Sequence, residues 1–159
     1  MRKLSHLNSR GEASMVDVSA KPLLLREAIA RGEIRLAKST LKLIESDRIA
    51  KGNVLAAARL AGIMAAKKTG ELIPLCHPLP ITHCEVSFEI PKTRDRIIIS
   101  ASAKIAAQTG VEMEALTAVS IAALTIYDMC KAVDKKMCLT AVRLVSKTKL
   151  PSVDCHPCE

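Results

Sequence analysis

Two neighbouring stretches of the sequence alternate between apolar and polar residues, and this pattern constrains the fold more than any other feature. Apolar residues occupy every second position over residues 84–90 and again over residues 97–105, and residues 91–95 between them have the composition of a turn. Successive side chains of a strand point to opposite faces, so each stretch is predicted to be a strand with one buried face. Together they predict an antiparallel hairpin.

Two longer patterns with helical spacing flank the hairpin. Residues 54–68 are rich in alanine and follow Asn53, a residue type that favours the N-cap position. The alanines and Gly62 carry little bulk, so a neighbouring backbone can approach closely there. Residues 112–134 have apolar positions every three or four residues, which predicts a second long helix.

Weaker signals predict the remaining elements. Pro22 and Gly32 bracket an apolar stretch and indicate a helix over residues 23–31, because proline suits the first turn of a helix and glycine follows the last. Four further short elements are expected: a possible edge strand at 15–18, a brief strand at 34–36, a helix capped by Ser39, and a last strand at 137–147.

This element order predicts an α+β fold. Long helices separated by antiparallel strands favour a ferredoxin-like sandwich, with the helices packed on one face of an antiparallel sheet. The 159 residues suit a single domain, whose ends at 1–14 and 150–159 are expected to be mobile. Since Phe88 and Tyr127 are its two aromatic residues, the core must be aliphatic.

The chain is basic, with 24 Lys and Arg residues against 16 Asp and Glu and a formal net charge of +8. This balance favours an anionic partner. Single-strand nucleic-acid binders stack bases on aromatic side chains, which are scarce here, so a phosphorylated small molecule is the partner expected in place of nucleic acid. A nucleic-acid-binding module of ferredoxin-like shape remains the first alternative.

The sequence predicts a cytoplasmic protein without a membrane partner. The first residues contain no apolar run typical of a signal peptide, and no segment approaches the ~20 apolar residues of a membrane span. The six cysteines are accordingly expected to be reduced thiols.

The segment Leu75-Cys76-His77-Pro78 is the first candidate site. Pro74 and Pro80 flank it and restrict the backbone, so the histidine is expected on a rigid loop. The alternative is a capped turn whose partly buried imidazole has no chemical role.

No metal site is predicted. Cys76 and His77, with His83 and Cys84, are possible zinc ligands, but two of their pairs are immediate neighbours, unlike the spacing in structural zinc sites. The motif Cys155-His156-Pro157-Cys158 has no fourth ligand in view.

Charged residues mark both ends of the second long helix. Glu112 and Glu114 follow Thr109-Gly110 at its start, where acidic residues are favoured for structural reasons and where ligands are also contacted. Asp128 and Lys131 share a face near its end. They form either a surface ion pair or, if their apolar neighbours bury this end, a catalytic pair with a lysine pKa lowered for general-base chemistry.

These two clusters cannot share a small-molecule site within one chain. At ~1.5 Å of rise per residue, Glu114 and Asp128 are about 20 Å apart on a straight helix. The simplest arrangement is that a second subunit brings its Asp128 and Lys131 beside His77 and Glu112 of the first. Lys51, at the start of the first long helix, is either an exposed cation or a phosphate contact.

Five segments, in order and at matching spacing, resemble the cyclic pyranopterin monophosphate synthase family of molybdenum cofactor biosynthesis. The similarity extends from about residue 4 to residue 147. The segments are residues 15–21, residues 51–68, Leu72-Ile73-Pro74-Leu75-Cys76-His77-Pro78-Leu79, residues 109–114, and Tyr127-Asp128-Met129-Cys130-Lys131-Ala132.

The resemblance implies a ferredoxin-like subunit in a homohexamer, a trimer of dimers, with active sites between subunits. The implied reaction converts 3',8-cyclo-7,8-dihydro-GTP, which a radical enzyme makes from GTP, into cyclic pyranopterin monophosphate and pyrophosphate. No cofactor is expected, although Mg²⁺ can accompany the triphosphate.

The resemblance also implies residue roles. Asp128 and Lys131 correspond to the catalytic pair, and Lys51 to a matching proton donor. Two lysines of displaced pKa and a carboxylate can move the protons that ring opening and closure need without a metal. Arg26 and His77 are candidates to stabilise the departing pyrophosphate. The expected substrate-binding residues are Leu75, Cys76, His77, Glu112, Met113, Glu114, Arg26 and Lys147.

One segment departs from the family pattern. Family members usually continue after the position of Lys147 with a Gly-Gly-Lys-Ser-Gly type of segment, whereas this chain reads Thr148-Lys149-Leu150-Pro151-Ser152. If that glycine-rich segment closes over the triphosphate, its loss affects substrate affinity or closure. An inactive scaffold with the same hexameric form is therefore a second alternative.

Overall fold

A four-stranded antiparallel sheet in the order β2-β3-β1-β4 is the framework of the computed structural model, which describes residues 10–151. The strands are β1 (Leu24–Arg35), β2 (His83–Glu89), β3 (Arg96–Ala107) and β4 (Cys138–Pro151). The helices are α1 (Lys38–Glu45), α2 (Val54–Lys67), α3 (Thr69–Leu72) and α4 (Glu112–Cys130).

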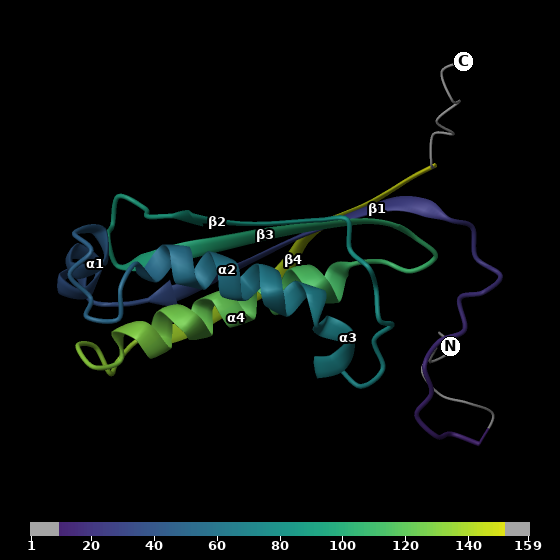
Figure 1. Ribbon diagram of the computed structural model, residues 1–159, viewed down its shortest axis with the longest axis horizontal. Coiled ribbons are helices and arrows are strands. Elements are labelled where there is room, and N and C mark those ends of the chain that lie inside the picture. Colours follow the sequence, from purple (N-terminus) through teal and green to yellow (C-terminus); the bar gives the residue numbers. More distant parts are fainter. Residues whose placement is uncertain (1–9, 152–159) are drawn as a thin grey trace, which may run out of the picture.

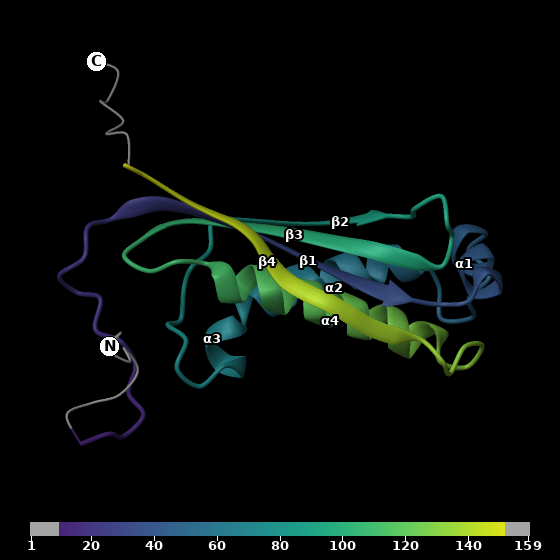
Figure 2. The same cartoon turned by 180° about the vertical axis from the view of Figure 1, so that it is seen from behind.

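The helices are gathered on one side of the sheet. α2 and α4 cover the same face, while α1 lies at one end of the strands and α3 at the other (Figure 1). Figure 2 shows β4 from behind, crossing the sheet edge next to α4. This arrangement confirms the predicted α+β, ferredoxin-like sandwich.

The predicted hairpin is confirmed as β2 and β3, which pair from His83 with Lys104 to Glu89 with Ile98. Its alternation has the expected result: Val86 and the alternate residues of β3 from Ile97 to Ile105 are buried beneath the helices. The opposite face of the sheet is polar, and ion pairs cross it from Lys104 to Glu27 (3.2 Å) and from Arg96 to Glu33 (3.0 Å). The core therefore lies between sheet and helices.

The helix predicted over residues 23–31 is wrong, because this stretch belongs to β1. Every second residue of β1 from Arg26 to Ile34 is buried, which is the period of a strand. β1 pairs with β3 on one side and β4 on the other. This long-range pairing outweighs the local signals of Pro22 and Gly32, and the predicted short strand at 34–36 is the end of the same β1.

The close approach of backbones at Gly62 is confirmed. A Cβ atom at Gly62 would lie 2.9 Å from the carbonyl oxygen of Ala118 on α4. The predicted N-cap is also confirmed, since the Asn53 side chain accepts a hydrogen bond of 2.8 Å from the amide of Ala56. α4 begins at Glu112 as predicted but ends at Cys130, four residues before position 134.

The amino-terminal cap of α1 differs from the prediction. The N-cap residue is Ala37 and not Ser39. The amide of Ala37 donates to Oδ2 of Asp134 (2.9 Å), and the Thr40 hydroxyl donates to the same oxygen (3.1 Å). A carboxylate from the α4–β4 turn thus caps a helix that begins almost 100 residues earlier in the chain.

The end segments also differ from expectation. Residues 15–18 are outside the sheet, so the possible edge strand is not formed. β4 extends past residue 147 to Pro151, and Leu150 and Pro151 pair with Leu25 and Leu24, so these two residues are ordered in the sheet. Of the other residues expected to be mobile, 1–9 and 152–159, with the motif at 155–158, lie outside the described residues.

α4 is long and apolar enough to meet a membrane-span criterion, contrary to the expectation that no segment approaches one. However, 56% of its apolar window is buried inside the fold, against α2 and the sheet. Its hydrophobicity is that of a core helix.

Candidate functional site

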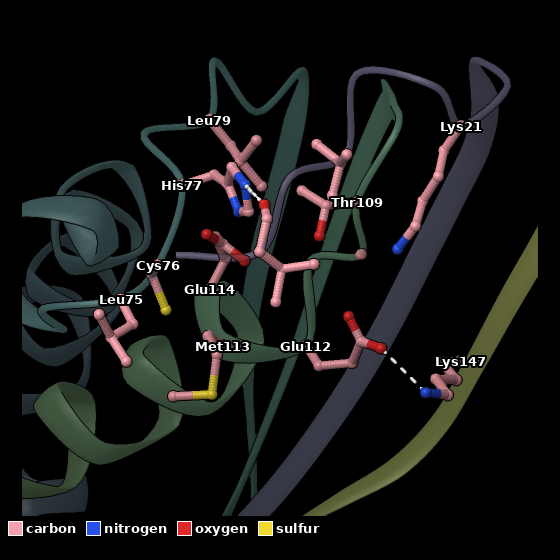
Figure 3. A pocket seen from close by; sticks show the side chains of 13 residues that line it. Lys21, Leu75, Cys76, His77, Leu79, Thr109, Glu112, Met113, Glu114 and Lys147 are labelled. Atoms are coloured by element: carbon pink, nitrogen blue, oxygen red, sulfur yellow. Dashed lines mark hydrogen bonds and ion pairs between the residues drawn. The ribbon is translucent and has the colours of Figure 1, made fainter. Parts of the chain in front are cut away.

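A cavity of about 510 Å³ opens beside the amino-terminal end of α4. Its walls come from four places in the chain: residues 16–21, the loop at 75–79, residues 109–114 and Lys147 of β4 (Figure 3). Seven of the eight residues predicted to bind substrate line it: Leu75, Cys76, His77, Glu112, Met113, Glu114 and Lys147.

The loop that carries His77 is held in place on both sides. Pro78 packs against α3 so closely that a Cβ atom at Gly70 would lie 2.9 Å from the Cα of Pro78. His77 Nε2 lies 2.9 Å from the carbonyl oxygen of Val16. Because a carbonyl only accepts hydrogen bonds, Nε2 must carry the proton, and Nδ1 remains for a ligand.

Glu112 is paired across the cavity with β4. Lys147 Nζ donates to Glu112 Oε1 at 3.1 Å, as Figure 3 shows. Burial raises the pKa of Glu112, but its own backbone amide and Lys147 lower it more, so the net shift is downward. A Cβ atom at Gly110 would overlap Glu112 Oε2, so the glycine leaves room for the carboxylate to fold back over the backbone.

The pKa of Glu114 is shifted in the opposite direction to that of Glu112. Only 2% of the residue is exposed, and burial, with a smaller repulsion from Glu112, raises its pKa. Burial and the charge of Glu114 likewise raise the pKa of the Cys76 thiol. The cavity therefore contains one carboxylate held ionised and one that binds a proton more readily.

Lys21 and Thr109 also line the cavity, although the sequence did not predict them as site residues. The Lys21 side chain extends into the cavity, opposite His77 (Figure 3). Both residues lie inside segments that carry the family resemblance, at 15–21 and 109–114. Their place in these segments is the sequence feature that could have identified them as site residues. Their polar side chains alone did not separate them from ordinary surface residues.

Arg26, the eighth predicted substrate residue, lies outside this cavity. It is 6% exposed, and its Nε and Nη2 donate to the carbonyl oxygens of Ala107 (2.8 Å) and Gln108 (2.9 Å). It lines a second cavity of about 360 Å³ that adjoins the first at Lys21, Thr109, Gly110 and Glu112. Two of the three guanidinium nitrogens of Arg26 thus hold the β3–α4 loop in place.

The structure brings Lys51, Asp128 and Lys131 together. Lys51 Nζ lies 2.7 Å from Asp128 Oδ2 and 3.0 Å from the Asp128 carbonyl oxygen. Lys131 Nζ lies 2.7 Å from Asp128 Oδ1. Hydrogen bonds from Lys131 and Lys51 lower the pKa of Asp128 to about 2.

The expected burial of this charged cluster is absent in the isolated chain. The side chains of Asp128 and Lys131 are more than half exposed. The hydrogen bond to Asp128 raises the pKa of Lys131, so the predicted lowering of a lysine pKa is wrong for the chain alone. Of their apolar neighbours, Ile126 and Cys130 are buried in the core, whereas Val133 is exposed.

The charged cluster and the 510 Å³ cavity lie at opposite ends of α4. None of Lys51, Asp128 and Lys131 lines the cavity. Asp128 follows Glu114 by 14 positions in the helix, which corresponds to about 21 Å. A single chain therefore presents two separate halves of the predicted site.

No group of three metal-binding side chains converges within residues 10–151. Cys76, Cys84, Cys130 and Cys138, the cysteines of this region, are free thiols.

Comparisons with known proteins identify the family of the chain. The family model described as the MoaC family matches residues 15–149. The chain is 55% identical over 147 residues to the cyclic pyranopterin monophosphate synthase of Parvibaculum lavamentivorans, covering 92% of each chain. It is 60% identical over 149 residues to the enzyme of the same name from Dinoroseobacter shibae, covering 92% of this chain and 93% of that one. The chain therefore belongs to the MoaC family of enzymes.

Proposed function

We propose that this enzyme converts 3',8-cyclo-7,8-dihydro-GTP into cyclic pyranopterin monophosphate, with release of pyrophosphate. The relatives bear the name cyclic pyranopterin monophosphate synthase, which supports a role in molybdenum cofactor biosynthesis. The observation that carries the proposal is the gathering of Leu75, Cys76, His77, Glu112, Met113, Glu114 and Lys147 around one cavity.

The cavity suits a polar, phosphorylated ring system. Lys21 and Lys147 supply positive charge, and the hydrogen bond between His77 and Val16 leaves Nδ1 available. Leu75 and Met113 give an apolar wall against which a flat ring can lie. Glu112 and Glu114 offer acceptors for ring N–H groups, one ionised and the other closer to its protonated form.

Proton transfer is assigned to Lys51, Asp128 and Lys131. Asp128 is ionised and holds both ammonium groups within 2.7 Å of its carboxylate oxygens. With its pKa raised, Lys131 enters the reaction protonated and acts first as an acid. Covering the cluster with a second subunit would remove water and lower the lysine pKa, which would favour donation of the lysine proton to the substrate.

The reaction then requires two chains. A second subunit would place its charged cluster against the cavity of the first, because about 21 Å separates the two within one α4. We propose the homohexamer, a trimer of dimers, as the assembly that does this. Exposed apolar residues on the outer faces of α2 and α4, namely Leu60, Met64 and Leu124, are suited to subunit contacts.

The chemistry as proposed uses side chains of the protein without a bound cofactor, and Mg²⁺ would enter only with the triphosphate. We place the enzyme in the cytoplasm. Its four described cysteines are free thiols, which suits a reducing compartment.

Turnover with the freshly made cyclic dihydroguanosine triphosphate tests the proposal. Pyrophosphate release and mass spectrometry of the pterin product are measured together for the wild type and for Lys131→Ala. We expect product from the wild type and a loss of at least 100-fold in the variant, on the order of one general acid–base contribution. A folded hexamer that yields no product would support the scaffold alternative.

A further inference from the structure

The loop between α1 and α2 carries Lys51, and packing holds this loop only weakly. Within residues 46–53, Ile49 is buried and the other residues are exposed. The side chain of Lys51 is itself about half exposed, and its ammonium is held by the carboxylate and carbonyl oxygens of Asp128 (2.7 and 3.0 Å). The place of Lys51 therefore depends on how the loop is fixed at its two ends.

The backbone of the loop is left-handed on both sides of Lys51. Asp47 has a φ of 51° and Gly52 a φ of 97°. Aspartate tolerates this region better than most residues, because its short polar side chain can hydrogen-bond locally. The amide of Gly52 donates to the carbonyl oxygen of Ile49 (3.0 Å), which places Lys51 inside a tight turn.

The side chain of Asn53 joins the two ends of the loop. Its Oδ1 accepts the capping hydrogen bond from the amide of Ala56 (2.8 Å). The other terminal atom must therefore be the amide nitrogen, and this nitrogen donates to Oδ1 of Asp47 at 3.0 Å. Asp47 lies two residues past the end of α1 and Asn53 is the N-cap of α2, so the hydrogen bond closes the loop around Lys51.

This hydrogen bond also ties the loop to the rigid part of the fold. Val54, the first residue of α2, is 1% exposed, and α2 packs against α4. Asp128 lies in the last turn of α4, two residues before the helix ends at Cys130. Fixing Asp47 to Asn53 thus fixes the loop relative to Asp128.

We infer that the hydrogen bond between Asn53 and Asp47 positions Lys51 against Asp128. Neither residue lines the two cavities described above, so both act through the loop as positioning residues. An amide that donates to a carboxylate makes a charge-assisted hydrogen bond, which is stronger than one between neutral groups. Without it, Lys51 would leave Asp128 paired with Lys131 alone. The consequence for the reaction, a slower proton transfer, rests on the proposed function.

Two substitutions remove the hydrogen bond from opposite ends. Asn53→Ser keeps an acceptor for the N-cap and the net charge of the protein, but it lacks the amide that reaches Asp47. Asp47→Ala removes the acceptor. Asp47→Asn is the conservative variant, because it keeps an oxygen that can accept from Asn53 and it tolerates the left-handed backbone.

The pKa of Asp128, measured by NMR of the side-chain carboxyl in the assembled protein without substrate, is the first readout. Asp128 faces Lys51 and Lys131, and displacing one ammonium raises the pKa of a neighbouring carboxyl. We expect a rise of about half a pH unit in Asn53→Ser and Asp47→Ala, and no rise in Asp47→Asn. Since loss of the Asp47 charge by itself would lower the pKa of Asp128, a rise in Asp47→Ala must come from the displaced lysine.

Steady-state turnover is the second readout. We expect Asn53→Ser to lower kcat about tenfold with little change in KM, because a displaced reacting group loses rate more than binding. Asp47→Asn should keep a kcat close to that of the wild type. A purely structural role of Asn53 would lower the melting temperature without this pattern.

An Asp128 pKa equal to that of the wild type in folded Asn53→Ser and Asp47→Ala would overturn the inference. If one variant does not fold, the other decides. Failure of the proposed function looks different, because the pKa is measured without turnover. A raised Asp128 pKa in a protein that makes no pterin would retain the positioning role and reject the synthase reaction, whereas wild-type turnover with an unchanged Asp128 pKa in the variants would do the reverse.

Discussion

Glu114 is a buried acid whose pKa is raised, and this makes a testable contribution to the pH dependence of stability. In the unfolded chain its pKa is near 4.5, whereas burial raises it in the folded state. Between these two values the folded state binds more protons, so stability falls as the pH rises. The contribution of Glu114 is fully present below pH 4.5 and is lost as the pH rises through the folded pKa.

We expect Glu114→Gln to remove this loss. The melting temperature of the variant, relative to the wild type, should increase as the pH rises from 4 through the folded pKa of Glu114 and then level off. Thermal unfolding of both proteins from pH 4 to pH 8 measures it. A difference in melting temperature that does not change with pH would show that the charge of Glu114 does not destabilise the folded protein. The catalytic activity of the variant should fall.

Site residues were more predictable than their geometry. The loop at Cys76-His77 and the acids at Glu112 and Glu114 were identified from short segments, and the structure brings them to one cavity. Arg26 was expected at the same site, but its buried position and its bonds to Ala107 and Gln108 depend on the pairing of β1 with β3. No local pattern around Arg26 contains that information.

At the scale of elements, the contact between α2 and α4 depends on Gly62. Alanine normally stabilises a helix relative to glycine by about 1 kcal/mol. At this position, however, the added methyl would meet the Ala118 carbonyl oxygen at 2.9 Å and Val86 at 3.1 Å. We expect Gly62→Ala to destabilise the protein by about 1–3 kcal/mol, the usual cost of overpacking.

Chemical denaturation of Gly62→Ala measures this effect. Ala56→Gly on the exposed side of the same helix is the matched control, because it gives the propensity difference without the contact. Both substitutions should destabilise, although they exchange the same methyl group in opposite directions. A stabilised Gly62→Ala protein would contradict the close packing.

Asp134 joins the end of α4 to the start of α1. Besides Ala37 and Thr40 on α1, the amide of Lys136 donates to Asp134 at 3.0 Å. We expect Asp134→Ala to lower the free energy of unfolding by about 2–3 kcal/mol at pH 7, since a buried charged acceptor and a helix cap are both lost. Asp134→Asn, which keeps an acceptor oxygen, should have a smaller effect, and denaturant unfolding compares the two.

The effect of Asp134→Ala should depend on pH. Burial raises the pKa of Asp134, but the hydrogen bonds from Ala37, Lys136 and Thr40 lower it more, so the folded pKa is below 3.8. The stabilisation is therefore fully present above pH 3.8 and is lost as the pH falls through the folded value. The difference in the free energy of unfolding between the wild type and Asp134→Ala should therefore be smaller at pH 2 than at pH 7. An equal difference at both pH values would show that the carboxylate charge does not stabilise this junction.

The elements themselves were predictable where one local pattern sufficed. α2, α4 and the β2–β3 hairpin follow from periodicity and capping in their own residues. For β1 the local signals mislead, because Pro22 and Gly32 suit the two ends of a helix, while its strand period is carried by small residues such as Ala28 and Ala30. Pairing with β3 and β4 decides its conformation, and those partners lie far away in the sequence.

For the whole molecule, a site shared between subunits has a clear signature in mixtures of variants. Neither His77→Ala, altered in the cavity, nor Lys131→Ala, altered in the charged cluster, should be active alone. If each site combines the cavity of one chain with the cluster of another, hexamers reassembled from equal amounts of both should regain about a quarter of the wild-type activity. Steady-state turnover before and after reassembly measures the regained activity. Activity that stays at the level of the separate variants would show that each chain contains its own complete site.

The order of the strands has a consequence for synthesis of the protein. β1 is the first strand of the chain, yet its neighbours in the sheet are β3 and β4, the last two. Translation at about 5–20 residues per second delays its first partner by roughly ten seconds after β1 is made. During that time both edges of β1 are unpaired, so the nascent chain exposes an aggregation-prone strand that a holding chaperone could recognise. The second edge of β1 is covered only after β4, which ends at Pro151, has been made.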